Sequence, residues 1–158
     1  MISEELIKKV TEKLINKNLT ISAAESCTGG LLSHYFTYLS GSSDYFERGV
    51  ISYSNNSKSE LLKVKKETIE KFGAVSDQTA KEMAEGIKKL AGTDIGISTT
   101  GIAGPTGGTK EKPVGLVFIG ISYKKNTDSI KFIFNGNRLE IKEKACEQAL
   151  KQLFKKLV

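Results

Sequence analysis

The chain has 158 residues, of which 39% are hydrophobic and 27% charged, a composition typical of a soluble globular protein. No apolar run approaches the roughly 20 residues of a membrane span, the first residues are acidic and amphipathic rather than signal-like, and two cysteines are too few for a disulfide scaffold. We therefore expect one domain over residues 1–158, in the reducing cytoplasm and without membrane contact.

The net charge is +6, and nearly all of the positive charge comes from lysines that are spread along the chain. Only Arg48 and Arg138 are arginines, although arginine is the usual reader of base edges. This pattern is typical of a solvated lysine-rich surface, so we expect no nucleic-acid partner.

In the first half of the chain, Leu6, Val10 and Leu14 recur at helical spacing and predict a helix over residues 3–17. A strand is expected over residues 19–24 and a buried helix from about residue 29 to residue 39. A second strand over residues 48–54 leads into a short helix that Asn55 or Ser57 would cap, and one or two helical turns follow at residues 66–71.

In the second half, Ser76 is the expected N-cap of a helix that ends at Gly92. Strands are predicted over residues 94–100, 114–123 and 129–134, with a polar turn at 124–128, and a closing helix spans 138–158. The predicted apolar stripes are Ala80, Met83, Ala84, Ile87 and Leu90 in the first of these helices, and Leu139, Ala145, Leu150, Leu153 and Phe154 in the closing one.

The early alternation of helices and strands predicts βαβ units with parallel strands, whereas the two adjacent late strands predict an antiparallel addition at the sheet edge. We expect an α/β fold, a three-layer α/β/α sandwich around a mixed, mostly parallel five-stranded sheet. Sites in such sheets form where loops leave the carboxyl ends of strands. Three loops qualify, at residues 25–30, 53–58 and 99–108, and all are rich in hydroxyls, amides or glycines.

The first of these loops carries two candidate nucleophiles, Ser26 and Cys27. The backbone N–H groups of Thr28, Gly29 and Gly30, with the N-terminus of the following helix, could bind an anion. Neighbouring side chains at a sharp turn point in different directions, so at most one of the two nucleophiles faces a cleft, and the sequence leaves open which. A tight turn whose small residues serve only packing is the alternative.

The only histidine, His34, lies within an apolar helix pattern, which is more typical of a packing or surface residue than of a catalytic base. A serine nucleophile then needs another base, and a lysine can serve where its surroundings lower its pKa. Lys58 offers this pairing, with Tyr53 as a proton relay. Surface positions for both are the alternative. One histidine and two distant cysteines do not suit a metal site, so no metal and no cofactor are expected.

The third loop leaves its strand at Thr100 and Gly101, and its glycines allow backbone N–H groups to approach a ligand. Arg138 begins the closing helix, where an arginine can clamp a phosphate or a carboxylate. A plain glycine-proline loop and a surface arginine are the alternatives.

Together these loops resemble the CinA C-terminal domain family. The matching segments follow one another in the family's order from about residue 20 to residue 138. They are Ala24-Glu25-Ser26-Cys27-Thr28-Gly29-Gly30, Gly41-Ser42-Ser43 with Phe46-Glu47-Arg48-Gly49, Tyr53-Ser54-Asn55 with Lys58, Gly73-Ala74-Val75-Ser76, Thr100-Gly101-Ile102-Ala103-Gly104-Pro105 with Gly107-Gly108, and Glu111-Lys112-Pro113-Val114-Gly115.

Stand-alone members of that family are nicotinamide-nucleotide amidases, which hydrolyse nicotinamide mononucleotide to nicotinate mononucleotide and ammonia. The resemblance implies that Ser26 is the nucleophile and that Tyr53 and Lys58 are its base partners. It also implies a homodimer. The substrate-binding residues it implies are Thr28, Gly29, Gly30, Asn55, Thr100, Gly101 and Arg138, the last at the phosphate.

A non-catalytic nucleotide-binding or competence-associated domain is the rival interpretation, because the same glycine loops would serve a binder. Ser26, Tyr53 and Lys58 together discriminate between the two, since a protein that only binds has no need of all three.

Overall fold

The computed structural model describes all 158 residues, and its regular elements form one five-stranded sheet with six α-helices and a short 3₁₀ helix. In chain order they are α1 (Glu4–Asn16), β1 (Ile21–Glu25), α2 (Leu31–Phe36), η1 (Ser42–Asp44), β2 (Phe46–Ile51), α3 (Asn55–Leu62), α4 (Lys66–Phe72), α5 (Asp77–Ala91), β3 (Ile95–Gly101), β4 (Leu116–Tyr123), β5 (Asn126–Ile133) and α6 (Arg138–Leu157).

The strand order across the sheet is β2-β1-β3-β4-β5. Strand β1 pairs in parallel with β2 and with β3, whereas β4 is antiparallel to both β3 and β5. The predicted mixed five-stranded sheet is therefore confirmed, with its parallel pairings in the half that βαβ connections build and its antiparallel pairings in the late strands. The carboxyl ends of β2, β1 and β3 meet at one edge.

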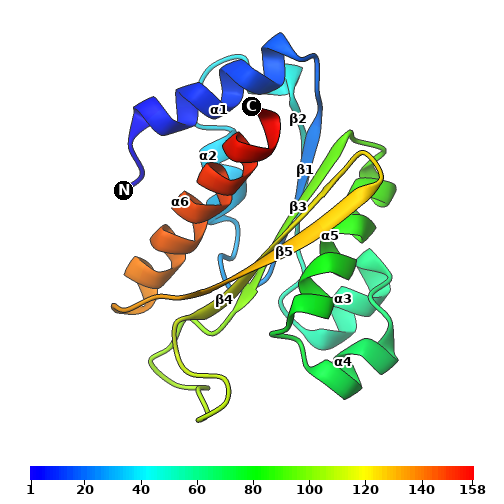
Figure 1. The fold of residues 1–158 in the computed structure, drawn as a ribbon, viewed down its shortest axis with the longest axis vertical. Helices are drawn as coiled ribbons and strands as arrows, with labels where there is room; N and C mark the ends of the chain where they lie inside the picture. The colour runs from blue at the N-terminus through cyan, green and yellow to red at the C-terminus, as the bar shows by residue number, and fades with distance from the viewer.

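Helices cover both faces of this sheet, with α1, α2 and α6 on one side and α3, α4 and α5 on the other (Figure 1). The larger apolar core, a cluster of 24 buried residues, lies between the sheet and the first helix group. A cluster of five, which includes Leu62, Met83 and Ile87, lies under the second group. The three-layer α/β/α sandwich predicted from the sequence is confirmed.

Helix α5 lies unusually close to the sheet because the strands present residues without bulk to it. A Cβ on Gly96 would lie 2.1 Å from the carbonyl oxygen of Ala84, and one on Gly120 would lie 2.4 Å from that of Ala80. The Ser98 hydroxyl, on the same face, donates to the Ala80 carbonyl at 2.6 Å. Close backbone contact takes the place of side-chain interdigitation here.

Several local predictions need correction. Leu90 and Leu139 were expected on apolar helix faces, but they are 48% and 61% exposed, and each lies in a terminal turn of its helix. The short helix α3 is capped by Ser54, whose hydroxyl accepts from the Ser57 backbone N–H, and not by Asn55 or Ser57. Strand β5 begins at Asn126, inside the predicted turn. The predicted N-cap Ser76 is confirmed.

Candidate active site

A cavity of about 340 Å³ opens at the edge where β1, β2 and β3 end, a volume suited to a small organic ligand. All three predicted loops contribute to its walls, together with the start of α6. The lining residues are Ser26, Cys27, Tyr53, Asn55, Lys58, Ala74, Val75, Thr100, Gly101, Ile102, Ala103, Gly104, Thr106, Gly107 and Arg138.

Ser26 and Lys58 meet at this cavity. The Nζ of Lys58 lies 2.9 Å from the Oγ of Ser26, although the two residues are 32 positions apart. Ser26 directly follows β1, and its backbone N–H donates to the Thr99 carbonyl on β3. Lys58 lies one turn into α3, because Ser54 ends the preceding extended segment and caps the helix. Strand pairing and capping thus bring the two side chains together.

The Lys58 amine is almost completely enclosed, with 1% of the residue exposed. Its Nζ also lies 2.9 Å from the Ser52 carbonyl oxygen and 3.0 Å from that of Tyr53. No carboxylate is among its hydrogen-bond partners. Burial lowers the pKa of Lys58 to about 8, so roughly a tenth of the amine is neutral at pH 7, far more than for an ordinary lysine.

The neutral form of this amine has two N–H bonds and one lone pair. The two carbonyl oxygens of Ser52 and Tyr53 can only accept, so they take the two N–H bonds. The remaining position around the nitrogen faces the Ser26 hydroxyl, and the lone pair is therefore aimed at the Ser26 proton. This is the arrangement that a general base requires.

Cys27, the rival nucleophile, also lines the cavity, but it is only 6% exposed. Burial is the main cause that raises the pKa of its thiol to about 12, with the charge of Glu25 adding to the effect. A thiol with this pKa stays protonated near neutral pH and is a weak nucleophile. The geometry favours Ser26, which alone of the two is hydrogen-bonded to Lys58.

The Tyr53 phenol does not lie between Ser26 and Lys58, where a proton relay was expected. It is 61% exposed, and its hydroxyl lies 3.2 Å from Nη2 of Arg138 rather than on Ser26 or Lys58. What Tyr53 gives to Lys58 is its backbone carbonyl. Arg138 also donates from Nη1 to the Gly104 carbonyl at 2.7 Å, so its guanidinium spans the cavity between the second and third loops.

Thr100, Gly101 and Asn55 lie at the cavity as expected. The Thr100 hydroxyl donates to the Ala74 carbonyl at 2.7 Å and ties β3 to the opposite wall. At Gly101, a Cβ would lie 2.6 Å from the Leu116 carbonyl oxygen, so only glycine fits there. Asn55 begins α3 and is exposed.

Thr28, Gly29 and Gly30 do not line the cavity, in contrast to the substrate-binding position expected for them. The Thr28 hydroxyl and the N–H groups of Gly29 and Gly30 have acceptors within the chain. The Thr28 hydroxyl and the Gly30 N–H both donate to the carboxylate of Glu25, and the Gly29 N–H donates to the Ser26 carbonyl. The predicted anion site at the start of α2 is therefore filled by the chain's own carboxylate.

Glu25 is thus the important residue that sequence reasoning did not assign. A charged residue at the end of a strand of small and apolar residues, shortly before two glycines, was the available signal. By contrast, the backbone N–H groups of Cys27 and Thr28 have no acceptor in the chain. Cys27 follows Ser26 directly and lines the cavity, so its N–H group is available to an oxyanion there, whereas Thr28 does not line the cavity.

His34 lies outside the cavity, on the exposed side of α2, with its ring edge-on to those of Tyr35 and Tyr38. The predicted packing or surface position of His34 is confirmed. No group of three or more histidine, cysteine or acidic side chains is close enough to bind a metal ion, and none of the helices has the length and apolar character to cross a bilayer.

The CinA C-terminal domain family matches residues 3–157. A CinA-like protein from Endomicrobium trichonymphae is 53% identical over 145 residues, which are 92% of this chain and 34% of the relative. A CinA-like protein from Kosmotoga olearia is 52% identical over 150 residues, which are 94% of this chain and 36% of the relative. The chain therefore spans little more than a third of the length of these relatives.

Solved structures resemble the chain over its full extent. The competence damage-inducible protein A of Klebsiella pneumoniae matches with a TM-score of 0.95 and 34% identity, covering 99% of this chain and 98% of that one. A competence/damage inducible protein of Agrobacterium tumefaciens matches with a TM-score of 0.91 and 35% identity, covering 98% and 97%.

Proposed function

This chain belongs to the CinA C-terminal domain family, and from that membership together with the Ser26–Lys58 pair we propose that its cavity hydrolyses the carboxamide of nicotinamide mononucleotide to nicotinate mononucleotide and ammonia. The observation that carries the proposal is the buried Lys58 amine 2.9 Å from the Ser26 hydroxyl. A pair of this kind has a direct use in acyl transfer and none in simple binding.

In the first half of the reaction, neutral Lys58 takes the hydroxyl proton as the Ser26 oxygen attacks the carboxamide carbon. The tetrahedral oxyanion accepts a hydrogen bond from the free N–H group of Cys27, a residue that lines the cavity. Protonated Lys58 then gives the proton to the departing nitrogen, and ammonia leaves. A nicotinoyl ester on Ser26 remains.

In the second half, a water molecule takes the place of the ammonia, and Lys58 removes its proton as it attacks the ester carbonyl. Collapse of the second oxyanion releases nicotinate mononucleotide and returns the proton from Lys58 to Ser26. Every step uses one base that alternates between its neutral and charged forms, which suits a pKa of about 8.

The charge of the cavity suits a phosphorylated substrate. Its lining includes Arg138 and Lys58 and no carboxylate. Arg138 uses one donor on Gly104 and one on the Tyr53 hydroxyl, so other guanidinium donors stay available for a phosphate at the start of α6. Tyr53 and Asn55 also line the cavity and offer an aromatic ring and an amide to the rest of the substrate.

The decisive test measures ammonia release from nicotinamide mononucleotide with no metal added, comparing the wild type with Ser26→Ala. We expect Ser26→Ala to lose roughly 10³-fold or more of the wild-type kcat, since removal of a nucleophile disables the whole catalytic unit. Ser57→Ala, which removes a half-buried hydroxyl on α3 that donates to the Ser54 carbonyl and does not line the cavity, is the matched control and should keep wild-type activity.

Ammonia release by Ser26→Ala at the wild-type rate would contradict the proposal. Loss of activity in Cys27→Ser, with Ser26→Ala active, would move the nucleophile to the thiol. A wild type that binds the mononucleotide without releasing ammonia would support the rival binding domain. The homodimer and the absence of nucleic-acid binding stay predictions.

A further inference from the structure

Glu25 is completely buried, yet it is an acidic residue next to the proposed nucleophile. Its carboxylate accepts five hydrogen bonds. Oε1 accepts from the Thr28 hydroxyl at 2.6 Å, the Gly30 N–H at 3.2 Å and the Leu32 N–H at 2.9 Å. Oε2 accepts from the backbone N–H of Ser33 at 2.9 Å and from the Ser33 hydroxyl at 2.6 Å. All five donors lie in residues 28–33.

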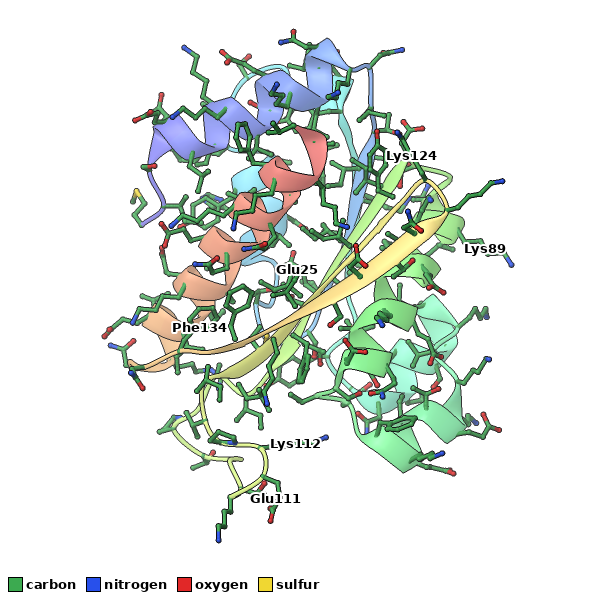
Figure 2. The ribbon with its side chains drawn as sticks, viewed as in Figure 1. Glu25, Lys89, Glu111, Lys112, Lys124 and Phe134 are labelled. Carbon is green, nitrogen blue, oxygen red and sulfur yellow. The ribbon has the colours of Figure 1, made fainter.

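These contacts enclose the turn that carries Ser26. The carboxylate joins the strand before Ser26 to the first turn of α2 after it, so the chain is fixed on both sides of the nucleophile. Figure 2 labels Glu25 near the centre of the molecule, among the side chains between the sheet and the helices. A carboxylate that accepts several backbone N–H groups is strongly held.

Thr28 extends this arrangement to β3. Its hydroxyl proton is donated to Glu25, so the hydroxyl of Thr99, 2.8 Å away, must be the donor to Thr28. Thr99 in turn accepts the Ser26 backbone N–H on its carbonyl. The Ser26 backbone is therefore connected to the Glu25 carboxylate through Thr99 and Thr28.

The backbone of Glu25 holds the base side of the site. Its carbonyl accepts the Ser52 N–H at 2.8 Å, and Ser52 supplies one of the carbonyl oxygens that orient Lys58. One residue thus contacts the segments that carry both members of the Ser26–Lys58 pair, without lining the cavity itself.

We propose that Glu25 is a positioning residue for the proposed amidase, whose carboxylate fixes the Ser26 hydroxyl against the Lys58 amine and holds the turn that carries the free N–H group of Cys27. It touches neither substrate nor reacting atoms. This inference rests on the proposed function.

A carboxylate is needed at this position, and an amide of the same shape does not replace it. In Glu25→Gln, an NH₂ group would replace one oxygen. It would face the N–H groups of Gly30 and Leu32 or that of Ser33, and none of these backbone donors can turn to accept. The turn must then move, and displacement by about 1 Å can cost on the order of 100-fold in rate.

Two readouts test this inference. The first is kcat and KM for ammonia release from nicotinamide mononucleotide. The second is the rate at which a fluorophosphonate probe labels Ser26, measured by peptide mass spectrometry, which does not depend on the substrate. For Glu25→Gln we expect kcat and the labelling rate to fall on the order of 100-fold with KM nearly unchanged.

Glu82→Gln is the matched control. The Glu82 carboxylate accepts from the Lys65 N–H at 2.9 Å and the Thr68 hydroxyl at 2.6 Å, a similar helix-start contact on α4. Glu82→Gln should lower the melting temperature yet keep the wild-type kcat and labelling rate.

Thr28→Val is the second variant, for use if Glu25→Gln does not fold. It removes one hydrogen-bond donor to the carboxylate and leaves Glu25 in place, so we expect kcat to fall about 10-fold.

Wild-type kcat and labelling in folded Glu25→Gln would overturn the inference, as would wild-type rates in Thr28→Val where Glu25→Gln does not fold. A loss confined to KM would also overturn it. A labelling rate whose pH dependence is shifted in Glu25→Gln would also overturn it, because Glu25 would then act through the pKa of Lys58.

If the wild type is labelled at Ser26 but releases no ammonia, the proposed substrate is wrong, and Glu25 is judged on labelling alone. A wild type inert in both assays refutes both proposals.

Discussion

At the scale of single residues, the chemistry of the site depends on how Lys58 is surrounded. In the sequence it is one of many lysines, in a short polar helix. In the fold it is buried, faces two carbonyl oxygens and a hydroxyl, and has a pKa of about 8. Its pairing with Ser26 was predicted from residue types and spacing. The exposure of Tyr53 and its contact with Arg138 were not, because the direction of a side chain after a strand end depends on the neighbouring loop.

The pKa of Lys58 predicts how the reaction depends on pH. Because the neutral amine is the base, kcat/KM should rise about 10-fold for each pH unit well below 8 and level off above it. Initial rates of ammonia release between pH 6 and pH 9 check this. A rate that is flat over this range, or that falls as pH rises toward 8, would exclude Lys58 as the base.

At the scale of elements, the packing of α5 on the sheet determines where the cavity wall lies. The segment before α5 supplies Ala74 and Val75 to the wall, and the Thr100 hydroxyl ties Ala74 to β3. The opposite wall belongs to the loop between β3 and β4, whose tip at Glu111 and Lys112 projects beyond the sheet in Figure 2. The Lys112 amine donates to the Phe72 carbonyl at 2.6 Å and joins the two walls.

The close contact between α5 and β3 predicts that Gly96→Ala is destabilising. The new Cβ would lie 2.1 Å from a helix carbonyl oxygen, so the helix must move away from the sheet. We expect a loss of about 1–3 kcal/mol in the free energy of unfolding, measured by denaturant titration. Lys89→Ala, on the exposed side of the same helix, should change it by less than about 0.5 kcal/mol. An unchanged midpoint in Gly96→Ala would contradict the packing described.

At the scale of the whole molecule, two cores of unequal size cover the sheet, and the site lies at the edge where the parallel strands end. The single sheet joins segments from Ile21 to Ile133, so the positions of Ser26, Lys58 and Arg138 depend on the complete fold. Burial of a lysine without a carboxylate partner opposes folding, so it lowers the free energy of unfolding of the entire chain.

Global stability should therefore respond to pH through Lys58. Below about pH 8 the amine is charged in both folded and unfolded chains, and its burial is fully unfavourable. Between about 8 and its ordinary value of 10.5, only the unfolded chain keeps the proton, so folding becomes more favourable as pH rises. Each pH unit contributes about 1.4 kcal/mol, which gives roughly 3 kcal/mol over this interval.

Lys58→Met removes this dependence and retains most of the side-chain volume. The free energy of unfolding of the variant, relative to the wild type, should be highest below pH 8 and should decline by roughly 3 kcal/mol toward pH 10.5. Urea titrations at several pH values measure the difference, in which other titrating groups cancel. A difference that does not vary with pH would show that Lys58 has an ordinary pKa in the fold.

The sequence by itself determined the α/β alternation, the N-cap at Ser76, the three loops at one sheet edge and the family, because periodicity, capping residues and collinear motifs are local properties of the chain. Only the tertiary structure decided between Ser26 and Cys27 as the partner of Lys58. Only the tertiary structure, too, showed that the Glu25 carboxylate, and not a ligand, binds the N–H groups at the start of α2. The physical reason is that burial and the direction of each hydrogen bond depend on the folded backbone, which residue patterns alone do not give. Thr99 contacts the nucleophile turn from a distant strand and Ser52 contacts the base, whereas Ser33 contacts Glu25 from the adjoining helix.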